Sequence, residues 1–177
     1  MEDYKLFIQI KVLDKQELFN IFNSFIEKSN ISIDYINYDK KLPSYHLNYD
    51  NKSLEIVLFI KNISDSGKGN TADKLRLQIP DISNTYFETE KNRLFLLCGL
   101  IYYNNKPILV IWDAKRYIYH KTSRSAYIGF ADINKVYFDG FLEKYDANGQ
   151  IFACDENNLK NAIEGFYEFS YCEELTW

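Results

Sequence analysis

Two stretches of the 177-residue chain bring together cations and hydroxyls, which hold phosphate oxygens in proteins, and the first stretch also contains glycines. In the first, Gly67 and Gly69 allow close approach of the backbone to a ligand, and Ser66, Lys68 and Asn70 add side-chain donors. The glycine and lysine spacing does not match a nucleotide P-loop, and a strand rather than a helix is expected to follow. Two interpretations remain open: a plain hairpin loop, and a loop that contacts nucleic acid.

The second stretch runs from Lys115 to Tyr127 and contains no carboxylate. Arginine can grip guanine in a bidentate manner, serine hydroxyls can hold phosphates, and tyrosine rings can stack, so this mixture suits contact with DNA. A solvated cationic turn is the alternative. The candidate contact residues are Lys115, Arg116, Tyr117, Tyr119, His120, Lys121, Ser123, Arg124 and Ser125.

A catalytic alternative uses acidic residues near the same region. Pro80-Asp81 and Asp113-Ala114-Lys115 resemble the PD…(D/E)xK signature of metal-dependent nucleases, in which two carboxylates hold a divalent ion beside a lysine. The pattern is short, and aspartate replaces the commoner glutamate before the lysine. An Mg²⁺-dependent nuclease that uses Asp81, Asp113 and Lys115 is therefore the second hypothesis.

The charge distribution favours a polyanionic partner in the middle of the chain. The net charge is −4, yet residues 61–124 carry 11 Lys/Arg against 6 Asp/Glu. Residues 132–177 carry 3 lysines against 10 acids. A basic centre between acidic ends could bind DNA on one face and repel it elsewhere. A third hypothesis is a protein-interaction module whose acidic flanks bind the partner.

Cysteine and histidine usage predicts no metal site and no cofactor. The three cysteines form no C-x-x-C pair, and the only histidines, His46 and His120, are far apart. Neither a secretion signal nor an apolar run of membrane-spanning length is evident, so a cytoplasmic protein without membrane contact is expected.

Apolar periodicity predicts a mainly β, α+β chain with peripheral helices. Asp14 and Glu17 have capping-box spacing and should begin a helix that ends near Ser29. A last helix, capped by residues 155–158, should run to about Phe169. Residues 1–50 would form a strand–helix–strand addition, and 51–177 the β domain. The expected strands are 4–12, 31–38, 54–60, 74–79, 93–103, 107–112, 126–130, 134–138 and 151–154.

Two segments carry a family resemblance. They read LEIVLFIKNISDSGKGNTADKLRLQIP from Leu54 and RLFLLCGLIYYNNKPILVIWDAKRYIYHKTSRSAYIG from Arg93. Their pattern and order resemble the target-recognition domains of bacterial restriction systems of the LlaJI type. More broadly, they are similar to the plant B-three-type pseudobarrel of the EcoRII and BfiI effector domains.

The resemblance implies an open seven-stranded pseudobarrel with two arms that enter the DNA major groove. Ser66, Gly67, Lys68 and Asn70 would lie on the first arm, and 115–125 on the second. Arg76, a further candidate DNA contact, would lie with Gln78 on the outward side of the strand that follows the first arm, where both are either structural residues or phosphate contacts. Trp112 and Asp113 would hold the base of the second arm. The implied function is sequence-specific binding of double-stranded DNA without catalysis in this domain. Cleavage would belong to nuclease or ATPase domains or subunits of the same restriction system.

Overall fold

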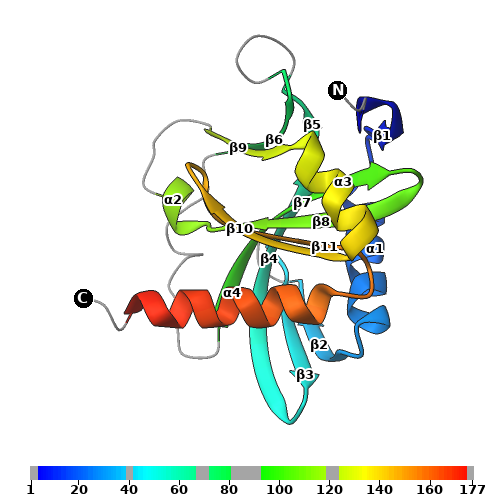
Figure 1. Cartoon of the computed structure of the whole chain (residues 1–177). Helices are drawn as coiled ribbons and strands as arrows, with labels where there is room; N and C mark the ends of the chain where they lie inside the picture. The colour runs from blue at the N-terminus through cyan, green and yellow to red at the C-terminus, as the bar shows by residue number, and fades with distance from the viewer. Residues whose placement is uncertain (1–3, 39–41, 67–71, 81–92, 119–123, 175–177) are drawn as a thin grey trace.

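The computed structural model describes residues 4–38, 42–66, 72–80, 93–118 and 124–174. Among them, eight strands form one mixed sheet, and three further strands form a small second sheet (Figure 1). In chain order the elements are η1 (Tyr4–Phe7), β1 (Ile8–Gln9), α1 (Lys15–Lys28), β2 (Ser32–Asn37), β3 (Ser44–Tyr49), β4 (Lys52–Asn62), β5 (Ser64–Asp65), β6 (Lys74–Ile79), β7 (Arg93–Tyr103), β8 (Lys106–Trp112), α2 (Lys115–Ile118), β9 (Arg124–Gly129), α3 (Phe130–Asp139), β10 (Phe141–Asp146), β11 (Gly149–Cys154) and α4 (Leu159–Glu174).

The large sheet is built around β7. Its strand order is β10-β11-β8-β7-β4-β3-β2, with β1 pairing the end of β7. The β4–β7 pair is parallel, whereas the other neighbours are antiparallel. Because a parallel pair needs a crossover connection, the chain between β4 and β7 is free to build the second sheet from β5 and β6.

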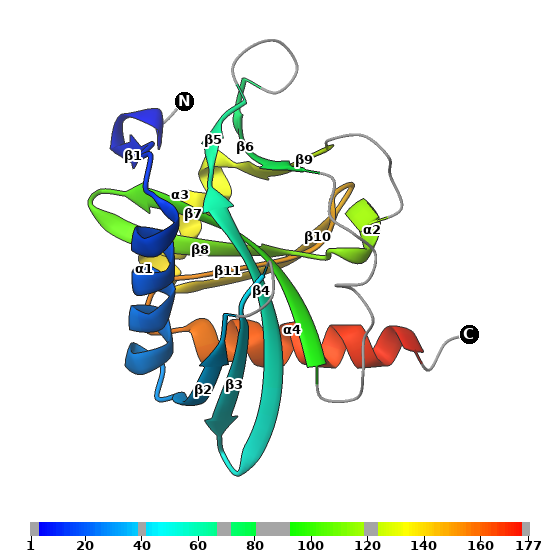
Figure 2. The ribbon, with the colours of Figure 1, turned by 180° about the vertical axis from the view of Figure 1, so that it is seen from behind.

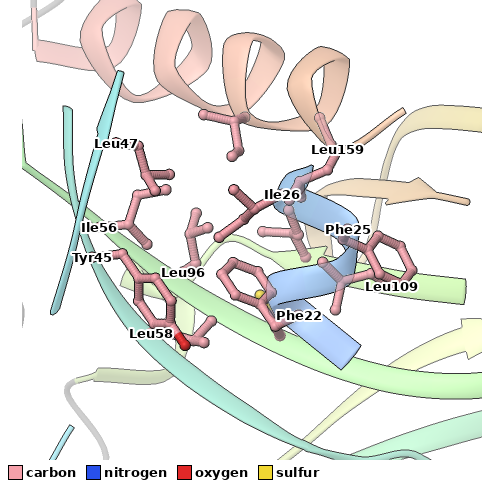
Figure 3. Close-up of a cluster of buried hydrophobic side chains, with 14 of the residues drawn as sticks. Phe22, Phe25, Ile26, Tyr45, Leu47, Ile56, Leu58, Leu96, Leu109 and Leu159 are labelled. Atoms are coloured by element: carbon pink, nitrogen blue, oxygen red, sulfur yellow. The ribbon is translucent and has the colours of Figure 1, made fainter. Parts of the chain in front are cut away.

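Both faces of the central strands are buried, which explains their nearly continuous apolar sequence. Successive residues of β7 alternate between two cores: Leu94 and Leu96 pack on one side, and Phe95 and Leu97 on the other. On the first side lie α1 and α4, and Figure 3 shows Phe22 and its neighbours between α1 and the strands. On the second side lie α3 and the small sheet.

The two covering layers are separated in space as well as in sequence. In Figure 1 the long helix α4 passes in front of the large sheet, and in Figure 2 the strands lie in front of that helix. The small sheet has the order β5-β6-β9 and lies at the top in both views. Its inward residues, such as Leu75, Leu77 and Ala126, are fully buried against the large sheet.

The predicted first helix is confirmed, including its capping box. The Asp14 side chain accepts from the Glu17 backbone N–H at 2.9 Å, and the Glu17 carboxylate accepts from the Asp14 N–H at 2.7 Å. The proposed boundary at residue 50 falls in the turn between β3 and β4. These strands pair from Ser44↔Val57 to Tyr49↔Lys52 and share one core with α1.

The α1 and α4 helices are joined by one serine. Ser29 follows α1, and its hydroxyl accepts the backbone N–H of Leu159, the first residue of α4, at 3.0 Å. The same hydroxyl donates to the Glu156 carbonyl at 3.3 Å. A residue 130 positions away in the chain therefore accepts one of the N–H groups at the start of α4 that have no partner within the helix.

Two strand predictions are wrong. Instead of a strand over Tyr4–Val12, the chain forms η1 and the two-residue β1, because only Tyr102 and Tyr103 of β7 remain for it to pair with before the turn. Residues 134–138 lie within α3. The i, i+3 spacing of Ile133 and Val136 places both in the core.

The mainly β, α+β class is confirmed, but the seven-stranded pseudobarrel is not. Among the described residues the strands form an open sheet covered by a smaller one, and they do not close into a barrel. The crossover between β4 and β7 is what separates the small sheet from the large one.

Candidate nucleic-acid interface

The outward face of the small sheet is lined by polar and cationic side chains. On β6 the inward residues Leu75, Leu77 and Ile79 alternate with outward Lys74, Arg76 and Gln78. The cross-strand register places Arg76 between Ser64 and Tyr127, and it places Gln78 opposite Ser125. The face therefore carries hydroxyl, amide, guanidinium and phenol groups in adjacent rows.

Arg76 lies on the middle strand of this face. The side chain is half-buried, and its guanidinium makes no hydrogen bond or ion pair with any residue in the described part of the chain. The buried Nε is a donor without an acceptor, which costs free energy in the unbound protein. Because Nε itself is buried, an anionic ligand would meet the terminal nitrogens of the guanidinium and not this donor.

Other cations near Arg76 are also uncompensated. The Lys74 ammonium has no partner among the described residues, and Lys61 reaches only the Gln78 carbonyl, at 3.4 Å. Asp73 precedes Lys74 and is exposed. The cations of the face are thus available to an external polyanion.

Arg116 and Tyr117, both predicted as DNA contacts, hold α2 on the turn between β10 and β11. The Arg116 guanidinium donates to the Ala147 carbonyl and to the Tyr145 hydroxyl, each at 2.9 Å. The Tyr117 hydroxyl points to the Asn148 carbonyl at 3.4 Å. Burial raises the pKa of Tyr117 to about 12. These two side chains therefore position the second stretch within the protein.

The nuclease hypothesis rests on residues with different placements. Asp113 is buried. Its carboxylate accepts the backbone N–H of Lys115, the first residue of α2, at 3.1 Å. The Lys115 ammonium is exposed and unpaired within the described ranges. Asp81 lies outside the described residues, and among those that are described no three His, Cys, Asp or Glu side chains form a metal-binding group.

The second stretch re-enters the small sheet at Arg124. This residue begins β9 and pairs with Ile79, and its charge lowers the pKa of the nearby Tyr117 against the dominant effect of burial. Ser125 follows on the outward face, opposite Gln78. The predicted contacts at Gly67, Lys68, Asn70, Tyr119, His120, Lys121 and Ser123 lie outside the described residues.

The stems of the two predicted arms attach to opposite ends of β6. The first stem is a hairpin in which Asp65 pairs with Leu75 and the Ser66 N–H donates to the Lys74 carbonyl at 3.3 Å. The second stretch joins the small sheet at Arg124, which pairs with Ile79 at the other end of the same strand. Six residues of β6 span about 17 Å, so the outward face of the small sheet lies between the two stems.

Trp112 joins the two sheets beneath this face. Its ring is fully buried, and its indole N–H donates to the Tyr127 carbonyl of β9 at 3.1 Å. Gly99 of β7 makes room for it, because a Cβ at Gly99 would lie 2.9 Å from the Trp112 ring and 2.5 Å from Ile63. The expectation that Trp112 and Asp113 hold the base of the second stretch agrees with these contacts.

The contacts expected from the sequence left out Lys61, Lys74 and Tyr127, and Gln78 was expected to be either a structural residue or a phosphate contact. The alternation of β6 already predicted that Lys74 and Gln78 face outward. The missing information was the pairing of β6 with β9, which lies about 50 positions later and brings Tyr127 beside Arg76.

Comparison with known proteins gives one finding. The model of the methylase-associated X1 family, MTaX1, matches residues 54–163, from the start of the central strands into α4. The chain belongs to this family. Neither a curated protein nor a solved structure matches it. Within the described ranges, no helix combines the length and the apolar composition needed to cross a membrane.

Proposed function

We propose that this methylase-associated X1 protein binds double-stranded DNA as the sequence-specificity module of a restriction–modification system. The family description ties the chain to methylases, which are partners of restriction enzymes in such systems. Cleavage would then reside in nuclease or ATPase parts of the same system. The observation that carries the proposal is the row of uncompensated cations on the outward face of the small sheet.

Charge is the first support. A cation that already has a carboxylate partner gains little from a phosphate, whereas an unpaired cation releases condensed counterions when it binds one. Lys74 and Arg76 are of the second kind. Lys115 and Arg124 lie on the second stretch and are likewise unpaired within the described ranges.

Shape is the second support. A two-stranded ribbon fits into the major groove, and the β5–β6 stem is such a ribbon, projecting from the body in both views (Figures 1 and 2). The duplex would lie along the outward face, with phosphates near Lys74 and Arg76 and the β5–β6 stem directed into a groove.

The chemistry of the face assigns different roles to its residues. Lys74 and Lys61 are point charges suited to phosphates, and Arg76 can grip a phosphate or a guanine edge with two donors. Gln78 and Ser125 carry donors and acceptors that can read base edges. Tyr127 lies opposite Arg76 in the β6–β9 register.

Fluorescence anisotropy of a labelled duplex tests the proposal. At low salt the wild-type chain should bind, and Lys74→Glu with Arg76→Glu should weaken binding by at least a hundredfold. Lys52→Glu with Lys28→Glu is the matched control, with the same charge change on the far side of the sheet, and should change affinity by less than fivefold. No binding by the wild type, or equal losses in both pairs, would refute the proposal.

A further inference from the structure

A row of four aromatic rings runs from the N-terminal segment to the end of α3, on a surface that the proposed DNA interface does not use. Phe7 contacts Tyr103 with 5.8 Å between ring centroids, Tyr103 contacts Tyr137 at 5.1 Å, and Tyr137 contacts Phe138 at 5.1 Å. Tyr103 is buried, but the two ends of the row are not. We call Leu6, Phe7, Tyr103, Tyr137 and Phe138 the aromatic row.

Large apolar side chains of the row face solvent. Leu6 is 75% exposed, Phe138 is 73% exposed and Phe7 is 50% exposed. Isolated exposed apolar residues are common, but a contiguous group on two elements marks an interaction surface in a water-soluble domain. Contacts between η1 and α3 make these residues one surface.

Two lysines lie beside the row, one over Tyr137 and one over Phe130, which begins the helix that carries Tyr137 and Phe138. The Lys5 ammonium lies 5.0 Å from the Phe130 ring centroid, and the Lys106 ammonium lies 5.0 Å from that of Tyr137. Neither forms an ion pair with a described residue. Lys135 and Asp139 on α3 are both exposed and offset one another in charge.

The charges indicate which occupant fits. A second copy that met this surface across a twofold axis would add two more unpaired lysines and only the Lys135–Asp139 charges that already offset one another, which disfavours a symmetric dimer. The rings offer few hydrogen-bond donors to a DNA duplex, so DNA is a poor match for this surface. An apolar protein surface rimmed by carboxylates matches both the aromatic centre and the lysine rim.

We infer that the aromatic row docks a protein partner with an apolar centre and an acidic rim, and that this partner is the DNA methyltransferase of the same system. The choice of partner rests on the proposed function and on the family description. Phe138 and Leu6 are the anchors, because they have the largest exposed apolar surface of the row. Lys106 contributes charge complementarity and therefore mainly accelerates association.

Titration calorimetry with the purified methyltransferase tests the inference. The wild-type chain should bind with one-to-one stoichiometry, and Phe138→Asp and Leu6→Asp should each weaken binding at least tenfold. Lys106→Glu should weaken it at low salt, and the difference should shrink as salt rises. Tyr35→Asp is the matched control, because Tyr35 is an exposed aromatic on β2, at the other end of the molecule, and should change affinity less than twofold (Figure 1).

Two further measurements keep this inference separate from the DNA proposal. Phe138→Asp should keep the thermal midpoint and the DNA affinity of the wild type, so a failure of DNA binding leaves the docking result interpretable. Absence of methyltransferase binding, equal binding by all variants, or loss of DNA affinity in Phe138→Asp would each overturn the inference. Sedimentation that shows self-association of the wild type, abolished in Phe138→Asp, would also overturn it.

Discussion

The two layers that cover the large sheet both pack an apolar face against it, but they differ in how many of their cations have carboxylate partners. Each layer packs an apolar face against one face of the central strands, with helical spacing in α1 and strand alternation in β6. On the helical side three lysines have carboxylate partners: Lys28 pairs with Glu156 at 2.5 Å, Lys52 with Glu164, and Lys160 with Asp50. Lys15 of α1 has none among the described residues, and its ammonium lies 5.5 Å from the Phe19 ring centroid. On the small sheet, Lys74 and Arg76 have none among the described residues.

This difference separates charges that serve the fold from charges left for a ligand. Surface ion pairs contribute little to stability, so the helical layer gains mainly by presenting a neutralised surface. Neighbouring cations without partners repel each other and are tolerated only at a modest cost in free energy. The small sheet therefore differs from the helical layer in placing unpaired cations at neighbouring outward positions of a single strand.

The largest expected effects test whether both layers belong to one cooperative unit. Phe22→Ala in the helical core should destabilise the fold by about 3–5 kcal/mol, and Leu77→Ala in the small-sheet core by about 2–5 kcal/mol, since both side chains are fully buried. Urea unfolding followed by far-UV circular dichroism measures both. Each variant should show one transition. A biphasic curve for Leu77→Ala alone would mean that the small sheet unfolds separately.

A smaller effect is expected where Trp112 ties the small sheet to the large one. Trp112→Phe leaves the Tyr127 carbonyl without its indole donor and should cost about 1–3 kcal/mol. Gly99→Ala should disturb the same contact by crowding Trp112 and Ile63. Both variants should lower the thermal midpoint and weaken DNA binding together. If Trp112→Phe is destabilised but binds DNA as tightly as the wild type, then DNA binding does not depend on this link between the two sheets.

The helical layer has its own single-residue link at Ser29. Ser29→Ala removes the hydroxyl that accepts from Leu159 N–H and should destabilise the fold by about 0.5–2 kcal/mol with no change in DNA affinity. Ser32→Ala is the matched control: its exposed hydroxyl bonds only the Asn48 carbonyl, and its loss should cost less. Equal denaturation midpoints for the two variants would contradict the proposed cap.

The smallest effect concerns alkaline pH and the docking of α2. The folded protein raises the pKa of Tyr117 from about 10 to about 12, so it favours the neutral phenol. The stabilisation is fully present below pH 10 and is lost as pH rises toward 12. Tyr117→Phe cannot ionise there, so the stability difference between wild type and variant should shift in favour of the variant between pH 10 and pH 12. A difference that is constant over this range would contradict the assignment.

Local signals in the sequence predicted much of the fold. The capping box of α1 lies within four residues, and the apolar runs of β4 and β7 reflect burial on both faces. The strand prediction for the segment before α1 was wrong because the alternation in that segment suggests a long strand, whereas only two of its residues pair with β7. The strand prediction for residues 134–138 was wrong because the apolar positions there also fit a helix.

The candidate site was predictable only where it depends on one strand. The outward direction of Arg76 follows from the alternation of β6. The neighbours of Arg76 and the packing of Arg116 and Tyr117 depend on pairings across the chain, with β9 and with the turn after β10. Such contacts leave no local pattern, so a basic segment that serves the fold cannot be distinguished by composition from one that meets a ligand.

The salt dependence of DNA affinity tests the central claim most directly. A double variant, Lys74→Gln with Arg76→Gln, should have a log–log salt slope that is smaller than that of the wild type by about 1.8, because each lost phosphate contact removes about 0.9. The matched pair Lys28→Gln with Lys52→Gln should keep the wild-type slope. Identical slopes for all three proteins would contradict the account, since the unpaired cations of the small sheet would then not meet phosphates.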